Sequence, residues 1–250
     1  MTKFSISIII PALNEEENLI DTVDTIVGAV KDRFSGYEII IFDDCSVDST
    51  GEIADRLAKS NVNIRVVHNS QTMCFGYNFK EGVKLAQYDY LLMIPGDNDV
   101  ARDTMTYMFG FIGLADCVIS HVTNVPCDRP LWRRVISKIF TFIINTAYGL
   151  NLRYFNGPTI YKADVVKGVD ITTHSFAYQV EILSKMLKKG RSYMEIPITL
   201  KGRVRGTTKA FNLKNILNVV KAFLRIFWFL RIKNRKIYNK KGIKIEAKEV

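Results

Sequence analysis

Short runs of β-branched and other apolar residues, each followed by polar residues, recur through the first part of the chain and limit the folds open to it. The runs span residues 4–10, 38–42, 63–67 and 90–94. Segments with apolar residues at helical spacing lie between them, at 15–30, 46–57 and 79–86. Strands that alternate with helices predict an α/β fold, with an open, mostly parallel sheet flanked by helices.

Carboxylates gather where these predicted strands end. They are Glu15 after the first strand, Asp43 and Asp44 at the end of the second, and Asp97 and Asp99 after the fourth. Parallel strands bring their carboxyl ends to one edge of the sheet, which is where ligands bind in open α/β folds. Acidic groups brought together there repel one another unless a cation or hydrogen-bond donors lie between them.

The fourth strand runs into the stretch LLMIPGDNDV, in which Asp97 and Asp99 flank a single amide. Two carboxylates just beyond a strand can hold Mg²⁺ or Mn²⁺, which prefer hard oxygen ligands and often share them with substrate phosphates. The alternative is a solvated Pro-Gly-Asp-Asn turn, because these residues favour turns.

The net charge of +10 over 250 residues favours an anionic partner, such as nucleic acid, a phosphorylated substrate or an anionic membrane. We expect no nucleic acid, because the chain has no zinc finger or ribonucleoprotein motif and its strand ends are acidic. The four cysteines form no CxxC pair and are expected to be reduced thiols. The first apolar run stops at Pro11 without a cleavage site, so we expect no signal peptide. No run reaches the ~18 to 20 apolar residues of a spanning helix.

Several stretches, in order, carry a resemblance to a known family. They are ISIIIPALNEEENL, EIIIFDDCSVDST, the Asp-x-Asp element, RPLWRRVISKIFTFIINTAYGLNLR, NGPTIYK, FAYQVEILSKMLKKG and EIPITLKGRVRGTTK. Over residues 4–210 the chain resembles family-2 glycosyltransferases of the GT-A fold, in the branch of polyprenyl-phosphate (dolichol-phosphate) sugar synthases. The resemblance implies a GT-A domain at 1–210, with a nucleotide-binding half (1–100) and an acceptor half (101–210).

The resemblance also implies roles for single residues. Asp97 and Asp99 match the metal-binding and catalytic element, with Asp97 also at the nucleotide, although the family usually reads Asp-Ala-Asp-x-Gln. The base site is implied to include Pro11, Leu13, Glu15, Asp43 and Asp44. Leu13 stands where the family commonly has a tyrosine.

The remaining implied positions lie in the acceptor half. Arg203 and Lys209 match a basic element that faces the diphosphate, and they are the other expected catalytic residues. Arg134, Ser137 and Glu181 are acceptor candidates. A further departure is Asn156-Gly157-Pro158, where many of these synthases read Thr-Ser-Gly-Phe, close to where the sugar or acceptor is expected.

Two helices of similar design are predicted in the second half of the chain. Polar residues form one narrow stripe on each, at Arg134, Lys138, Thr141 and Asn145 and at Lys214, Asn218, Lys221 and Arg225. The rest of each helix is apolar, so we expect 211–232 to lie in a membrane interface, followed by a basic tail at 233–250. The alternative is a pair of helices packed on each other with a disordered tail.

Together these features predict an inverting glycosyltransferase that moves a sugar from a UDP- or GDP-linked donor to a polyprenyl phosphate. We expect a peripheral (monotopic) protein on the cytoplasmic face of an anionic membrane, with a homo-oligomer left open. One alternative is a hydroxyl acceptor with Glu181 as general base, although Glu181 also fits an ordinary surface position on a helix. Another is a catalytically inactive binder of sugar nucleotides.

Overall fold

The computed structural model describes residues 3–124, 131–201 and 213–246. Its eight strands form one sheet in the order β3-β2-β1-β4-β6-β5-β7-β8. The strands are β1 (Ser5–Ala12), β2 (Gly36–Asp43), β3 (Ile64–His68), β4 (Tyr90–Met93), β5 (Cys117–Val122), β6 (Thr159–Lys162), β7 (Ser192–Ile198) and β8 (Ile243–Lys244). Only β6 runs antiparallel to its neighbours, β4 and β5. The predicted open, mostly parallel sheet is therefore confirmed.

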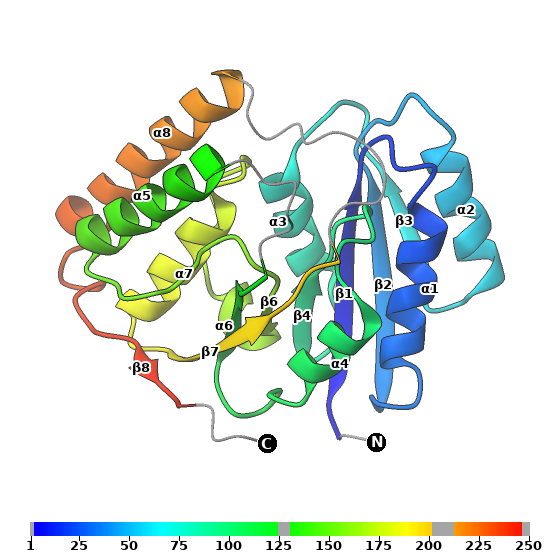
Figure 1. Ribbon diagram of the computed structural model, residues 1–250, viewed down its shortest axis with the longest axis horizontal. Helices are drawn as coiled ribbons and strands as arrows, with labels where there is room; N and C mark the ends of the chain where they lie inside the picture. The colour runs from blue at the N-terminus through cyan, green and yellow to red at the C-terminus, as the bar shows by residue number, and fades with distance from the viewer. Residues whose placement is uncertain (1–2, 125–130, 202–212, 247–250) are drawn as a thin grey trace.

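Helices cover both faces of this sheet (Figure 1). They are α1 (Leu19–Val30), α2 (Thr50–Ser60), α3 (Phe75–Leu85), α4 (Arg102–Phe109), α5 (Leu131–Tyr148), α6 (Ala163–Lys167), α7 (Tyr178–Lys188) and α8 (Leu213–Phe227), which continues into the π-helical turn η1 (Trp228–Lys233). Residues of α1, α2 and α4 share one buried cluster with one face of the sheet. Residues of α3, α6 and α7 share a second cluster with the other face.

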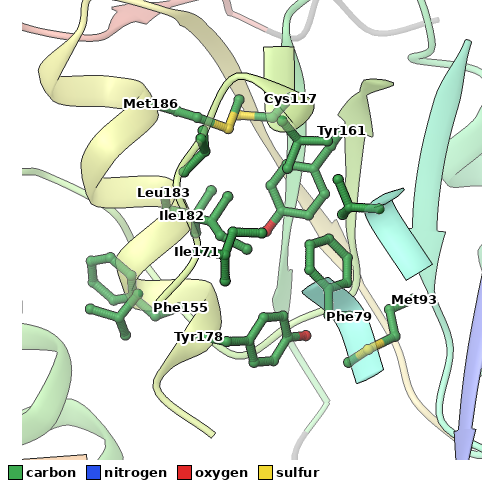
Figure 2. Close-up of a cluster of buried hydrophobic side chains, with 14 of the residues drawn as sticks. Phe79, Met93, Cys117, Phe155, Tyr161, Ile171, Tyr178, Ile182, Leu183 and Met186 are labelled. Carbon is green, nitrogen blue, oxygen red and sulfur yellow. The ribbon is translucent and has the colours of Figure 1, made fainter. Parts of the chain in front are cut away.

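The second cluster lies between α7 and the sheet. Figure 2 shows Phe79, Tyr161 and Tyr178 at its centre, with Ile182 and Met186 reaching in from α7. Phe79 packs against both tyrosine rings, with centroid distances of 5.6 and 5.2 Å. This packing covers one side of α7 along its whole length.

Helices α5 and α8 lie side by side and cover the other side of α7 (Figure 1). The Tyr148 hydroxyl donates to the backbone carbonyl of Phe223 at 2.8 Å, which joins the two helices. Ala222, Ile226 and Leu230 are buried in the same cluster as α7. The two predicted helices are thus present, and each buries one face in the core.

The opposite faces of the two helices remain exposed. We call this surface the α5–α8 outer face; it consists of Val135, Ile136, Ile139, Phe142, Ile143, Val220, Leu224, Trp228 and Ile232. Each of these side chains belongs to an exposed residue, and together they cover two adjacent helices. The two helices therefore pack against the core with one face and expose apolar side chains on the other. Within the described residues, no helix is both long enough and apolar enough to cross a membrane.

The basic C-terminal segment folds back onto the sheet. Ile243 and Lys244 pair in parallel with Ser192 and Tyr193 of β7. Tyr238 is buried and packs against Phe229, with ring centroids 5.6 Å apart. Up to residue 246 this segment is an ordered edge of the domain, which differs from the disordered tail considered above.

Candidate active site

The carboxyl end of β1 holds the loops that follow β2 and β4. The carbonyl of Ala12 accepts a hydrogen bond from the Asp44 amide at 2.8 Å, and the carbonyl of Pro11 accepts one from the Gly96 amide at 3.1 Å. Asp44 and the loop that carries Asp97 therefore flank the same strand end. The topology brings together residues that are far apart in the sequence, as the acidic strand ends predicted.

The loop that carries Asp97 and Asp99 is fixed from two sides. From α1, the Thr22 hydroxyl donates to the carbonyl of Gly96 at 3.0 Å, and the Thr25 hydroxyl donates to the Asn98 side chain at 3.2 Å. From the segment after β7, the Lys201 amide donates to the Asp99 carbonyl at 3.0 Å. The loop is thus held in one position before any ligand arrives.

Four non-glycine residues of the described chain have positive φ angles, and all four lie at this edge. They are Asn14 (55°), Cys45 (65°), Cys74 (70°) and Asn98 (52°). Asparagine tolerates this conformation, but in cysteine it costs ~1–3 kcal/mol, and such residues gather where function requires a particular geometry. One of these residues follows each of β1, β2, β3 and β4, so the strain marks this edge as the candidate active site.

The oxygen-rich pair Asp97 and Asp99 suits a divalent cation. Both residues are partly buried, and their carboxylates are hard ligands of the kind that Mg²⁺ and Mn²⁺ prefer. Among the described residues, no group of three or more acidic, histidine or cysteine side chains is placed to hold a metal. The pair therefore fits an ion that takes the rest of its ligands from water and a substrate diphosphate.

Asp44 is buried and organises the loop after β3. Its carboxylate accepts from the Asn69 side chain at 2.7 Å and from the amides of Met73 and Cys74 at 2.9 and 3.0 Å. A carboxylate has about four acceptor positions, so these bonds leave little capacity for a base. Direct recognition of the base by Asp44 stays a prediction; its observed partners are the loop residues.

Asp43 points toward β3, where it meets a residue that sequence reasoning missed. Its carboxylate accepts from the Ser46 amide at 3.0 Å and contacts Nδ1 of His68 at 2.9 Å. Nε2 of His68 contacts Asp55 at 3.1 Å. The hydrogen bond to Asp43 raises the pKa of His68, which is partly offset by burial. Burial opposes the shift at Asp43, but the bonds from Ser46 and His68 keep its pKa below the usual value.

The loop after β1 is joined to the start of α2. The Asn14 amide donates to Ser46 Oγ at 3.0 Å, and the Glu15 amide donates to Thr50 Oγ1 at 2.8 Å. The Glu15 carboxylate accepts from the Asn18 side chain at 2.8 Å, and Leu13 is partly buried. Pro11 and these loop residues thus lie at the predicted edge, while their contact with a base stays a prediction.

Glu181 occupies a different environment from either interpretation of its sequence position. It is 1% exposed, so the expectation of a surface helix residue is wrong. Its carboxylate contacts Lys185 Nζ at 2.6 Å and accepts from the Thr172 hydroxyl and the Thr173 amide at 2.7 and 2.8 Å. Burial raises its pKa, but Lys185 and these hydrogen bonds outweigh burial and lower it. This carboxylate is buried and both of its oxygens are bonded within the domain, so a role for Glu181 as a general base stays a prediction.

Other predicted residues are placed only in part. Arg203 and Lys209 lie outside the described residues, and so does the side chain of Arg134 on α5. Ser137 lies partly buried on α5. The carbonyl of Gly157 accepts from the buried side chain of Gln179 at 2.6 Å, which fixes the Asn156-Gly157-Pro158 stretch against α7.

Comparison with known protein families identifies the family of the chain that carries this site. The profile of the family described as Glycosyl transferase family 2 matches residues 7–187. The chain belongs to this family. The predicted family and the predicted glycosyltransferase class are therefore confirmed.

Relatives in family 2 point to one branch. The undecaprenyl-phosphate mannosyltransferase of Micrococcus luteus is 27% identical over 212 residues, covering 80% of this chain and 85% of that protein. The polyprenol monophosphomannose synthase of Mycolicibacterium smegmatis is 26% identical over 214 residues, covering 81% and 79%. These relatives match the predicted polyprenyl-phosphate sugar synthase branch.

A solved structure supports the fold independently. Glucosyl-3-phosphoglycerate synthase from Mycobacterium tuberculosis, in complex with Mn²⁺, UDP-glucose and phosphoglyceric acid, has a TM-score of 0.69 at 14% identity. The match covers 90% of this chain and 80% of that one. At this identity the likeness shows the fold, and the predicted GT-A architecture is confirmed.

Proposed function

We propose that this family-2 glycosyltransferase moves a sugar, with mannose the first candidate, from a nucleoside diphosphate to a polyprenyl phosphate. The observation that carries the proposal is the pair Asp97 and Asp99, held beyond β4 beside the end of β1. The mannosyltransferase relatives supply the sugar and the acceptor class. The half at 1–100 would bind the donor, and the half at 101–210 would bind the acceptor.

At the donor, Asp97 and Asp99 would hold Mg²⁺ or Mn²⁺. When bound, the ion would neutralise the negative charge that grows on the diphosphate as the bond to the sugar breaks. The positions of Arg203 and Lys209 in the family element support a second source of positive charge for the same diphosphate. The fixed loop around Asn98 would keep the carboxylates in place without reorganisation during the reaction.

At the acceptor, a phosphate oxygen is already anionic and needs no general base to attack the anomeric carbon. Direct attack from the side opposite the leaving diphosphate inverts the anomeric configuration. Glu181 is occupied by Lys185 and by Thr172 and Thr173. The absence of an available base at that position favours a phosphate acceptor over a hydroxyl acceptor. The protein would then act mainly by positioning and by stabilising charge.

The α5–α8 outer face supports work at a membrane surface. Its nine exposed apolar residues belong to α5, α8 and η1, and α5 and α8 lie side by side (Figure 1). Lys138, Lys221 and Arg225 are exposed on the same helices. An apolar face combined with cations suits the interface of an anionic leaflet. We therefore place the enzyme peripherally, on the cytoplasmic side where the nucleotide donors are found.

Binding of the sugar-nucleotide donor is the first test of the proposal. GDP- and UDP-linked sugars are screened by thermal shift with Mn²⁺, with Mg²⁺ and with chelator, using wild type and Asp97→Asn. At a hundredfold excess over Kd, a donor should stabilise the wild type by ~2.7 kcal/mol, and the effect should depend on the metal and on Asp97. A donor that binds in this screen but is not transferred in a separate assay with a polyprenyl phosphate would support the inactive binder. No stabilisation by any sugar nucleotide would contradict the proposal.

A further inference from the structure

Two cationic side chains converge on one bare patch of backbone, away from the candidate active site. A β-carbon added to Gly149 would lie 3.7 Å from an Nη atom of Arg231 and 3.8 Å from Nζ of Lys188. Gly149 is exposed, follows the last turn of α5 and has a φ of +64°. Gly149 directly follows α5, Lys188 ends α7 and Arg231 lies in η1, so tertiary packing assembles the group.

Lys188 is buried in an unusual way for a charged residue. It is 7% exposed, and among the described residues its ammonium makes no hydrogen bond or ion pair. Burial lowers the pKa of Lys188, and the nearby charges of Arg231 and Lys241 lower it further. Most of the side chain is buried, but Nζ itself stays accessible, so the ammonium is open to a partner from outside the domain. Within the part of the chain that the structure describes, neither Lys188 nor Arg231 forms an ion pair with a carboxylate.

The stabilisation of cations by helix C-termini is a simpler explanation, but it accounts for the position of only one of the two side chains. Cations are stabilised near helix C-termini, where unpaired carbonyls gather. Arg231 fits this explanation, since its Nε donates to the carbonyl of Ala147 in the last turn of α5 at 3.0 Å. Lys188 does not, because its ammonium donates to no carbonyl of the described residues. The other guanidinium nitrogens of Arg231 face Gly149 beside Lys188.

We propose that Gly149, Lys188 and Arg231 form a binding site for a phosphate group. We call it the Gly149 cradle. Guanidinium and ammonium groups bind phosphate through short, charge-assisted hydrogen bonds, and a bound anion would supply the partner that Lys188 lacks. The absence of a side chain at Gly149 leaves room for the anion against the backbone.

The cradle is separate from the site at the strand ends. It lies where the C-terminal ends of α5, α7 and η1 meet, at the left of Figure 1, whereas the carboxyl ends of β1 and β4 are at the top. Ile143 and Ile232 of the α5–α8 outer face belong to the same helical ends. The phosphate could therefore belong to a lipid headgroup or be free in solution. The proposal does not depend on the transfer reaction.

The test places a carboxylate inside the cradle. Gly149→Asp supplies an internal anion at a position where aspartate and asparagine tolerate a positive φ. The matched control, Gly149→Asn, has the same shape without the charge. A second control, Gly168→Asp, makes the same change in net charge at an exposed glycine that follows α6.

Two probes distinguish the sources of phosphate. Inorganic phosphate is titrated by calorimetry against chloride at constant ionic strength. Vesicles of phosphatidylcholine, with and without phosphatidylglycerol, are tested by co-sedimentation. Wild type, Gly149→Asn and Gly168→Asp should bind at least one probe, and Gly149→Asp should bind it about tenfold more weakly. The probe that responds identifies the source.

The other outcomes overturn the proposal. If the wild type binds neither probe, the cradle is only a meeting of helix ends. If Gly149→Asp binds as the wild type does, the cradle is not the site. If Gly168→Asp loses binding to the same extent as Gly149→Asp, net charge explains the effect and no local site is needed.

Discussion

Replacing Glu181 by glutamine should weaken the fold and leave the chemistry almost unchanged. Glu181 and Lys185 are 1% and 2% exposed, with Nζ and Oε1 2.6 Å apart. Lys185 also donates to the carbonyl of Asp170 at 2.5 Å and lies 4.4 Å from the centre of the Phe229 ring. Removing one partner of a buried ion pair costs ~3–5 kcal/mol, because the other charge is left buried and unpaired. The glutamine carbonyl can still accept one bond from Thr172 or Thr173, so we expect a loss of ~3 kcal/mol for Glu181→Gln.

The double variant Glu181→Gln/Lys185→Met removes the unpaired charge and keeps the volume. It should recover most of the lost stability, to within ~1 kcal/mol of the wild type. Unfolding free energies come from denaturant titration, and transfer rates are measured at a temperature where every variant is folded. We expect the rates to stay within about threefold, since a lost general base lowers the rate by ~10²–10⁴. A loss of a hundredfold in rate, with wild-type stability, would refute the structural role of Glu181 and restore the hydroxyl-acceptor alternative.

Three further predictions follow from other parts of the molecule. Asp97→Asn and Asp99→Asn should each abolish transfer while the circular dichroism spectrum and melting temperature stay close to wild type; normal turnover of both variants in chelator would rule out a metal there. Ile226→Ala, on the buried face of α8, should cost ~2–5 kcal/mol in unfolding free energy, whereas the exposed Leu224→Ala should leave stability unchanged and weaken co-sedimentation with anionic vesicles. Equal stability effects would contradict this division of α8 into two faces. The raised pKa of His68 should stabilise the fold fully below the ordinary histidine pKa of ~6.5, and this contribution should fade as the pH rises through the folded value. His68→Gln should remove that part of the pH dependence, and an identical stability profile for both proteins would exclude it.

The alternation of strands and helices could be predicted because each strand of the central sheet is a compact apolar run. The strand boundaries were close, but three helices begin elsewhere than expected, and α2 starts at Thr50 rather than residue 46. Helix α1 starts at Leu19 rather than residue 15, since Glu15 is held by Thr50 in the loop before it. Helix α3 starts at Phe75 rather than residue 79. It directly follows Cys74, whose amide donates a hydrogen bond to the Asp44 carboxylate.

The environment of α7 could not be predicted from its sequence. Glutamate is usually exposed, and a glutamate four residues before a lysine is the usual pattern of a surface helix. The sheet covers one side of α7, and the α5–α8 pair covers the other, so Glu181 and Lys185 are buried together. Long-range packing of the sheet, α5 and residues 213–246 against α7 creates that burial.

The C-terminal strand and the partners of Asp43 were missed for related reasons. Strand β8 is two residues long within a lysine-rich segment and pairs through its backbone, which leaves no apolar pattern. His68 ends β3 as Asp43 ends β2, so adjacent parallel strands bring them together. The position of a histidine at a strand end was the available signal for that contact.

The central claim is that this enzyme transfers a sugar to a lipid phosphate, and one assay tests it directly. Purified full-length protein is incubated with radiolabelled nucleoside-diphosphate mannose and Mg²⁺, with either a polyprenyl phosphate or the corresponding polyprenol as acceptor. The account predicts metal-dependent label in the lipid fraction with the phosphate, no label with the alcohol, an inverted anomeric configuration in the product, and no product from Asp97→Asn. Label transferred to the polyprenol, or equal transfer by Asp97→Asn, would contradict it.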